Sequence, residues 1–275
     1  MGKSNQLPFS GVKVIDFGQY IAGPAVAMIL ADLGATVIHV DPPAGPLWDS
    51  PANAVLNRGK HCLRLDLKTD KGLEEAKDLI RRADVVIENF RPGVMARLGL
   101  DFAKLREARP QLITLSMPGF ASNDQLRREW RAFEPIIASA SGVFTDMGQN
   151  RVLMGINPSF SPLPLASAYG TMLAVSAVAL ALQARQRTGM GDEIEVPLAS
   201  AVMEGLSYNS IHIENYPERY KTLREKEIER RRSNNLPMDL SYEALQEYLD
   251  PFYRSYECAD GRKFYRVCPS HRSHA

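Results

Sequence analysis

The chain has 275 residues, of which 45% are hydrophobic and 24% are charged, a balance typical of a folded globular protein. Its net charge of +1 excludes the strongly basic surface that general binding to nucleic acid or to an anionic membrane would need. The three cysteines, Cys62, Cys258 and Cys268, form no CxxC pair and no metal pattern, so we expect no metal site and a reducing, cytoplasmic environment.

The first ten residues show no signal-peptide pattern, and residues 12–40 then predict one βαβ unit. Residues 12–17 and 35–40 are apolar and β-branched, as in buried strands, and residues 25–33 have helical apolar spacing. Pro24 is expected at the first helical position. The glycines of the intervening loop, Gly18 and Gly23, lack the G-x-G-x-x-G spacing of a dinucleotide site, so a plain α/β unit without a ligand stays open.

Strands and helices continue to alternate up to residue 116. Strands are predicted over residues 62–67, 84–88 and 112–116, with helices over residues 71–82, 94–98 and 102–109 and with Thr69 as an N-cap. This alternation predicts an α/β fold with a Rossmann-like parallel sheet covered on both faces. In such sheets ligands bind beyond the carboxyl ends of the strands.

Several cations fall at those strand ends. Arg58 and Lys60 precede one strand, Lys68 follows it, and Arg97 follows the segment Asn89-Phe90-Arg91-Pro92-Gly93. Together they favour the binding of a small polyanion, because the protein as a whole is close to neutral. A solvated charged surface is the alternative for any one of them alone.

The second half of the chain changes in character. Its longest apolar run, 172–182, is shorter than the roughly 20 residues that cross a bilayer and predicts a buried, alanine-rich helix over residues 171–187, closed by Gly189. A strand at residues 192–197 and a helix at 199–209 follow. Residues 218–232 are highly charged and predict a linker or a helix that crosses open solvent.

Residues 253–257 and 263–268 predict a β-hairpin at the end of the chain. A hairpin is not stable by itself, so we expect the chain to be truncated within a second, small α+β domain. The predicted division is a large domain at residues 1–215, a charged linker at residues 216–235 and an incomplete small domain at residues 236–275.

Four motifs resemble the class III CoA-transferases. They are VIDFGQYIAGP with ADLGATVIHV, then NRGK with LDLKT, then ADVVIENFRPGV, then RQRTGMG. The resemblance covers roughly residues 10–205. It implies an acyl-CoA:carboxylate CoA-transferase with a large and a small domain, two chains that interlock as a homodimer, and CoA or acyl-CoA as a substrate with no covalently bound cofactor.

The resemblance also implies a CoA site. Tyr20, Ile21 and Ala22 match positions at the pantetheine and thioester end, and Leu65 and Lys68 match positions beside the adenine and its phosphates. Along the nucleotide and its phosphates the matching residues are Asn89, Phe90, Arg97 and Arg131.

The resemblance fails at the nucleophile. The family uses an aspartate that attacks the acyl-CoA thioester, and the aligned residue here is Ser167. A serine ester cannot become the enzyme–CoA thioester that CoA transfer requires. A racemase would need a histidine where Phe133 stands, and we interpret the nearby Glu134 and Asp146 as surface or structural acids.

Three functions therefore stay open. The chain is a CoA-transferase with altered chemistry at Ser167, a catalytically silent CoA-binding half of a two-domain transferase, or an acyl-CoA isomerase or lyase. The acyl donor and acceptor are not predicted.

Overall fold

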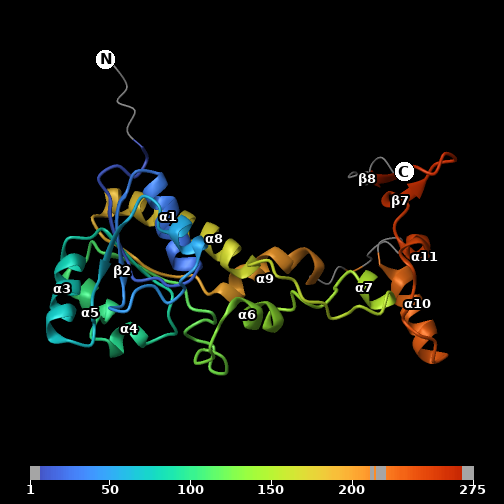
Figure 1. Ribbon diagram of the computed structural model, residues 1–275, viewed down its shortest axis with the longest axis horizontal. Helices are drawn as coiled ribbons and strands as arrows, with labels where there is room; N and C mark the ends of the chain where they lie inside the picture. The colour runs from blue at the N-terminus through green and yellow to red at the C-terminus, as the bar shows by residue number, and fades with distance from the viewer. Residues whose placement is uncertain (1–6, 211–213, 215–220, 268–275) are drawn as a thin grey trace, which may run out of the picture. The chain divides into compact units, whose positions relative to one another are not determined.

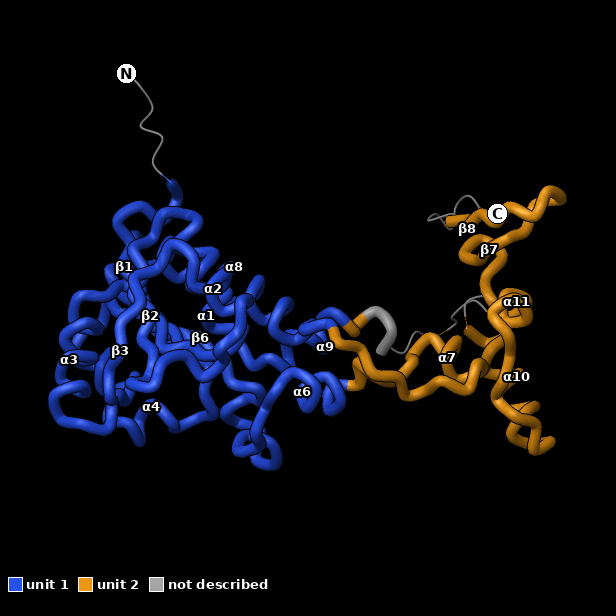
Figure 2. The backbone as a smooth tube through the Cα atoms, in the orientation of Figure 1, with its two compact units in different colours: residues 1–141, 163–205 blue, residues 142–162, 206–275 orange. Residues whose placement is uncertain are grey.

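The computed structural model describes residues 7–210, 214 and 221–267 of the chain. The chain divides into two compact units, shown in blue and orange in Figure 2. The first comprises residues 1–141 and 163–205, and the second comprises residues 142–162 and 206–275. The second unit thus includes a segment from the middle of the chain. The predicted domain boundaries at residues 215 and 235 stay predictions.

The first unit contains a six-stranded sheet in the order β3-β2-β1-β4-β5-β6. Figure 1 labels its strand β2. Every pair of neighbouring strands is parallel. The strands are β1 (Lys13–Asp16), β2 (Thr36–Asp41), β3 (His61–Arg64), β4 (Val85–Glu88), β5 (Ile113–Ser116) and β6 (Glu193–Glu195). The predicted Rossmann-like parallel sheet is confirmed, because this strand order is that of a dinucleotide-binding fold.

Helices follow the strands as the alternation predicts. Those of the first unit are α1 (Ala22–Asp32), α2 (Pro51–Leu56), α3 (Asp70–Arg81), α4 (Val94–Arg97), α5 (Phe102–Ala108), α6 (Glu134–Ala140), α8 (Leu165–Thr188) and α9 (Leu198–Ser210), which runs past the division. The Thr69 side chain accepts a hydrogen bond from Gly72 N, so the predicted cap is confirmed. The start of α1 was predicted wrongly: Pro24 is its third residue. The N–H that proline lacks is unpaired anywhere in the first turn, so its presence does not fix the start.

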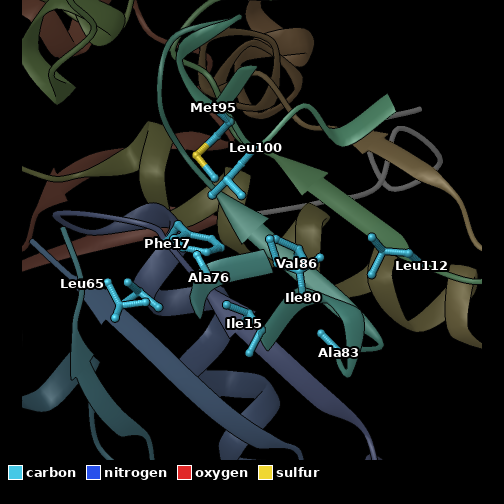
Figure 3. Packing of buried hydrophobic residues seen from close by; sticks show 11 residues of the cluster. Ile15, Phe17, Leu65, Ala76, Ile80, Ala83, Val86, Met95, Leu100 and Leu112 are labelled. Carbon is cyan, nitrogen blue, oxygen red and sulfur yellow. The ribbon is translucent and has the colours of Figure 1, made fainter. Parts of the chain in front are cut away.

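Buried apolar residues pack against both faces of the sheet. Figure 3 shows one face, where Ile15 and Val86 of the strands pack with Ala76 and Ile80 of α3. Successive strand residues point to opposite faces. Neighbours of these residues, such as Val14, therefore face the other layer, which α1 and α8 form by packing on each other.

Helix α8 is longer than predicted. It begins at Leu165 rather than at residue 171 and has 24 residues, which makes it long and apolar enough to cross a membrane by length and composition alone. Its position in the fold explains that composition, because Ala174 and Val178 are fully buried in the first unit. Gly189 closes it with φ of 73°, as predicted.

The second unit contains α7 (Asn150–Leu153), α10 (Thr222–Ser233), α11 (Tyr242–Leu245), a 3₁₀ turn (Gln246–Tyr248) and the hairpin β7 (Tyr253–Glu257) and β8 (Lys263–Val267). The hairpin is antiparallel, as predicted, although Cys268 lies outside the described residues. The expectation that residues 218–232 cross open solvent is wrong for α10. Its Ile228 packs with Leu153 and Leu245, and one buried apolar residue in a charged helix leaves no periodic pattern in the sequence.

Candidate functional site

Two loops meet where the strand order reverses, between β1 and β4. The Gln19 backbone N–H donates to Asn89 Oδ1 over 2.7 Å, and Asn89 Nδ2 donates back to the Gln19 carbonyl over 2.7 Å. This reciprocal pair joins the loop after β1 to the loop after β4. A reversal of strand order is the place where open α/β sheets bind ligands.

Two glycines allow this loop to close on the start of α1. A Cβ added at Gly18 would lie 2.8 Å from the Gly23 Cα, and one added at Gly23 would lie 3.3 Å from the Asn89 side chain. Tyr20, between them, has a left-handed φ of 65°, and its ring packs edge-on against Phe133 with 5.5 Å between centroids. The glycines that fail as a dinucleotide motif therefore serve close packing of the backbone.

A buried network of charged residues holds the loop after β1 in place. The Asp16 carboxylate accepts from Gly18 N over 2.8 Å, from Lys60 Nζ over 3.0 Å, and contacts His39 Nδ1 over 2.8 Å. Burial alone would raise the pKa of Asp16, but the Lys60 ammonium and His39 hold that pKa below its ordinary value. Burial opposes a charge on His39, yet its hydrogen bond to Asp16 raises the pKa of His39.

This network corrects one prediction. Lys60 is fully buried in its ion pair with Asp16, and Arg58 is paired with Asp32 at the surface. Both cations are engaged by carboxylates of the fold, so neither is available for the polyanion that the sequence pattern suggested. The sequence pattern groups them with Lys68 and Arg97, but both precede β3, at its amino end, and only the fold shows their carboxylate partners.

The first pocket has a volume of about 480 Å³ and lies over the joined loops. Seven residues singled out from the sequence line it: Tyr20, Ile21, Ala22, Asn89, Phe90, Arg131 and Ser167. They come from the β1 loop and the start of α1, the β4 loop, the segment before α6, and the first turn of α8. Further lining residues, which the sequence analysis did not assign to the site, include Gln19, Trp48 and Glu134.

A second pocket of about 420 Å³ adjoins the first, because Gln19, Leu47 and Phe90 line both. Leu65 and Lys68, predicted beside the nucleotide, line this second pocket. The remaining wall is largely apolar and includes Phe17, Val40, Pro42 and Leu98. Two adjoining hollows, one near Ser167 and one near Lys68, give room for an elongated ligand.

Arg97 lines neither pocket, although its chain neighbour Leu98 lines the second. Lys68, Arg97 and Arg131 are exposed, and within the described part of the chain none of the three is in an ion pair. These cations are therefore available to an anionic ligand, unlike Arg58 and Lys60. Their assignment to CoA stays a prediction.

The pocket end near α8 holds a hydrogen-bonded pair that the sequence did not predict. Ser167 Oγ donates to Glu134 Oε2 over 2.6 Å, and Ser167 N donates to the same oxygen over 3.1 Å. Ala166 N donates to Glu134 Oε1 over 2.7 Å. The two residues are 33 positions apart, so no motif links them, and Glu134 was interpreted as a surface or structural acid.

Glu88, at the end of β4, is a buried carboxyl group next to the β4 loop, although it lines neither pocket. Burial raises the pKa of Glu88 to about 7, although the hydrogen bonds from Ser116 and from the backbone of Phe90 work in the opposite direction. The Phe90 N–H donates to Glu88 Oε2 over 2.7 Å. Glu88 thus supports Phe90, one of the three residues that line both pockets.

The chain matches, over residues 9–273, the pattern of a family described as CoA-transferase family III. It is 69% identical to the CoA-transferase/lyase DddD of Marinomonas sp. (strain MWYL1) over the whole of this chain and 33% of that protein. It is 33% identical to the acetyl-CoA:oxalate CoA-transferase of Acetobacter aceti over 73% of this chain and 53% of that enzyme. A crystal structure of a CAIB/BAIF family protein from Brucella suis superposes with a TM-score of 0.70 and 27% identity, covering 96% of this chain and 67% of that one. The chain thus spans a third of the first relative and about half of the second.

Proposed function

From the premise that this chain belongs to CoA-transferase family III, we propose that it binds acyl-CoA and acts in the transfer of CoA between carboxylic acids. In that reaction the thioester bond of one acyl-CoA breaks and the CoA sulfur forms a thioester with the second acid. The first acid leaves as its carboxylate. No electrons are exchanged, so the protein needs to supply binding, orientation and a carrier for the acyl group or for CoA.

One observation carries this proposal. Residues that the motifs assign to CoA come from separate segments of the chain, yet they line two adjoining pockets at the reversal of the strand order. The apolar second pocket suits an adenine ring between Leu65 and Phe90, with the Lys68 ammonium available to its phosphates. The first pocket then receives the pantetheine arm and the thioester.

Ser167 favours a second candidate, a CoA-binding half without covalent chemistry of its own. Serine stands where the family uses its aspartate. The 69% identical relative is named a CoA-transferase/lyase, which keeps an acyl-CoA lyase as the third candidate.

The proposal extends to the setting of the protein. Acyl-CoA and a carboxylic acid are its partners, the chain pairs with a second copy as an interlocked homodimer, and it works in the cytoplasm. Cys62 and Cys258 are free thiols, which suits a reducing compartment.

Calorimetric titration of CoA and acetyl-CoA into the purified protein tests the proposal. We expect binding that weakens with added salt, because phosphate–cation contacts are screened. Lys68→Ala and Arg97→Ala should each weaken binding by about 1.4- to 5-fold, since an exposed ion pair contributes roughly 0.2–1 kcal/mol. Lys104→Ala, an exposed lysine of α5 outside both pockets, is the matched control. Unchanged affinity in both Lys68→Ala and Arg97→Ala would remove the predicted phosphate contacts, and no binding by the folded protein would refute the proposal.

A further inference from the structure

We propose that Glu134 is the nucleophile that carries CoA in this protein, in place of the carboxylate missing at position 167. The inference rests on the proposed function, because it assumes that acyl-CoA occupies the first pocket. It supplies what Ser167 lacks, a carboxylate that can form both an anhydride and a thioester.

The distance between the two residues is the first argument. Glu134 Oε2 lies 2.6 Å from Ser167 Oγ, so the carboxylate of Glu134 is one hydrogen bond away from the side chain at the family's nucleophile position. A carboxylate is therefore present at this point of the pocket, although it comes from α6 rather than from α8. Glu134 lines the first pocket and is half-buried, so a ligand in that pocket can reach it.

The donors around Glu134 are the second argument. The backbone N–H groups of Ala166 and Ser167 point at its two oxygens from the first turn of α8, a helix of 24 residues. Groups of this kind stabilise the oxyanion that develops when a carbonyl at that position is attacked. The Ser167 hydroxyl adds a third donor, which gives this serine a supporting role rather than a covalent one.

The reaction balances without any reagent beyond acyl-CoA and the acceptor acid. A Glu134 oxygen attacks the acyl carbon and the C–S bond breaks. CoA departs as its thiolate, and a glutamyl–acyl anhydride remains on the protein. The thiolate then attacks the glutamyl carbonyl carbon, the first acid departs as its carboxylate, and a glutamyl–CoA thioester remains. An acceptor carboxylate repeats the two steps in reverse order and restores Glu134.

A purely structural role for Glu134 is the competing explanation. Pro164 is the N-cap of α8 and makes no side-chain capping bond, so the Glu134 carboxylate caps that helix from α6. Loss of a cap costs about 1 kcal/mol of stability. A cap alone forms no covalent bond with a substrate, and this difference separates the two roles.

Trapping with hydroxylamine tests the inference on the intact protein. Acetyl-CoA and succinyl-CoA are each added, followed by hydroxylamine, and peptide mass spectrometry locates any hydroxamate. We expect a glutamyl hydroxamate at Glu134 in the wild type and in the control Glu75→Gln, an exposed carboxylate of α3. Ser167→Ala removes one of the three donors to Glu134, so we expect the same adduct in a smaller amount. Glu134→Gln should lose it entirely. The wild-type result stands even if Glu134→Gln folds poorly.

Two outcomes would overturn the inference. One is an acyl group on Ser167, which would make the serine the nucleophile. The other is no adduct on Glu134 while calorimetry shows that acetyl-CoA binds, which would leave the CoA-binding proposal intact. If acetyl-CoA does not bind the folded protein, the proposed function and the inference fail together.

Discussion

At the scale of single residues, Glu88 shows how burial changes the chemistry of a carboxyl group. It is only 6% exposed at the end of β4, and burial raises its pKa to about 7 from an ordinary value of 4.5. Its Oε2 accepts the Phe90 N–H, so its charge state acts on the loop that both pockets share. Below pH 7 the folded protein therefore holds a neutral acid at this position.

The pKa of Glu88 predicts a pH dependence of stability. Because the folded pKa lies above the unfolded one, the stability contributed by the protonated acid is fully present below about pH 4.5 and is lost as pH rises to about 7. Glu88→Gln keeps an acceptor for Phe90 and cannot ionise. We expect the difference in unfolding free energy between Glu88→Gln and the wild type to grow in favour of the variant between these pH values, by at most about 1.4 kcal/mol per pH unit.

Urea unfolding at several pH values measures this difference. Glu75→Gln, an exposed carboxylate of α3, is the control and should show no such trend. A constant difference between Glu88→Gln and the wild type from pH 5 to pH 8 would contradict the raised pKa.

At the scale of elements, the site depends on the hydrogen-bonded contact between the loops after β1 and β4. The loops after β1 and β4 are 70 residues apart in the chain, and the paired hydrogen bonds between Gln19 and Asn89 connect them directly above the reversal of the strand order. The first pocket lies over this junction, so its shape depends on one amide side chain that both donates and accepts.

Asn89→Asp tests the junction. The variant keeps an acceptor for Gln19 N, but it faces the Gln19 carbonyl with an oxygen instead of a donor. We expect a loss of roughly 1–3 kcal/mol in unfolding free energy and weaker binding of CoA. The control Gln111→Glu makes the same amide-to-acid change at an exposed position and should alter neither. Calorimetry and urea unfolding provide the two measurements, and unchanged CoA affinity in Asn89→Asp would separate the junction from the site.

At the scale of the whole molecule, α8 presents an apolar face that stays exposed among the residues that the structure describes. Tyr169 is 42% exposed, Met172 62%, Leu173 42% and Leu180 71%, and their helical spacing places them on one side of α8. The opposite side is buried in the first unit. An uncovered apolar helix face of this kind favours association with another polypeptide.

We expect this face to take part in the predicted pairing of two copies. Leu180→Glu should weaken self-association by tenfold or more, because burying a leucine contributes about 1.5–3 kcal/mol. Leu126→Glu changes an equally exposed leucine in the segment before α6 and is the matched control. Light scattering over a range of concentrations measures the mass, and a wild-type chain that stays monomeric at every concentration would contradict the pairing.

The sequence by itself determined the fold class, the family and most strand positions. Buried parallel strands are short apolar runs, and glycines, prolines and caps such as Thr69 mark the ends of elements. These features are local, so they can be predicted without knowing which element packs against which. The motifs predicted the family, and the comparisons confirm it. Helix starts were less predictable, as at Leu165, because packing rather than composition extends the first turn.

Only the tertiary structure decided which polar residues contact one another and which of them lie at the pockets. The sequence pattern assigned Lys60, before β3, and Lys68, after it, to one polyanion site, yet the first is buried against Asp16 and the second is exposed beside a pocket. Glu134 meets Ser167 across 33 residues because α6 and the first turn of α8 pack together. The spacing of apolar residues indicates which side of a segment is buried. The contacts between segments depend on the path of the whole backbone, and the chemistry of this site depends on those contacts.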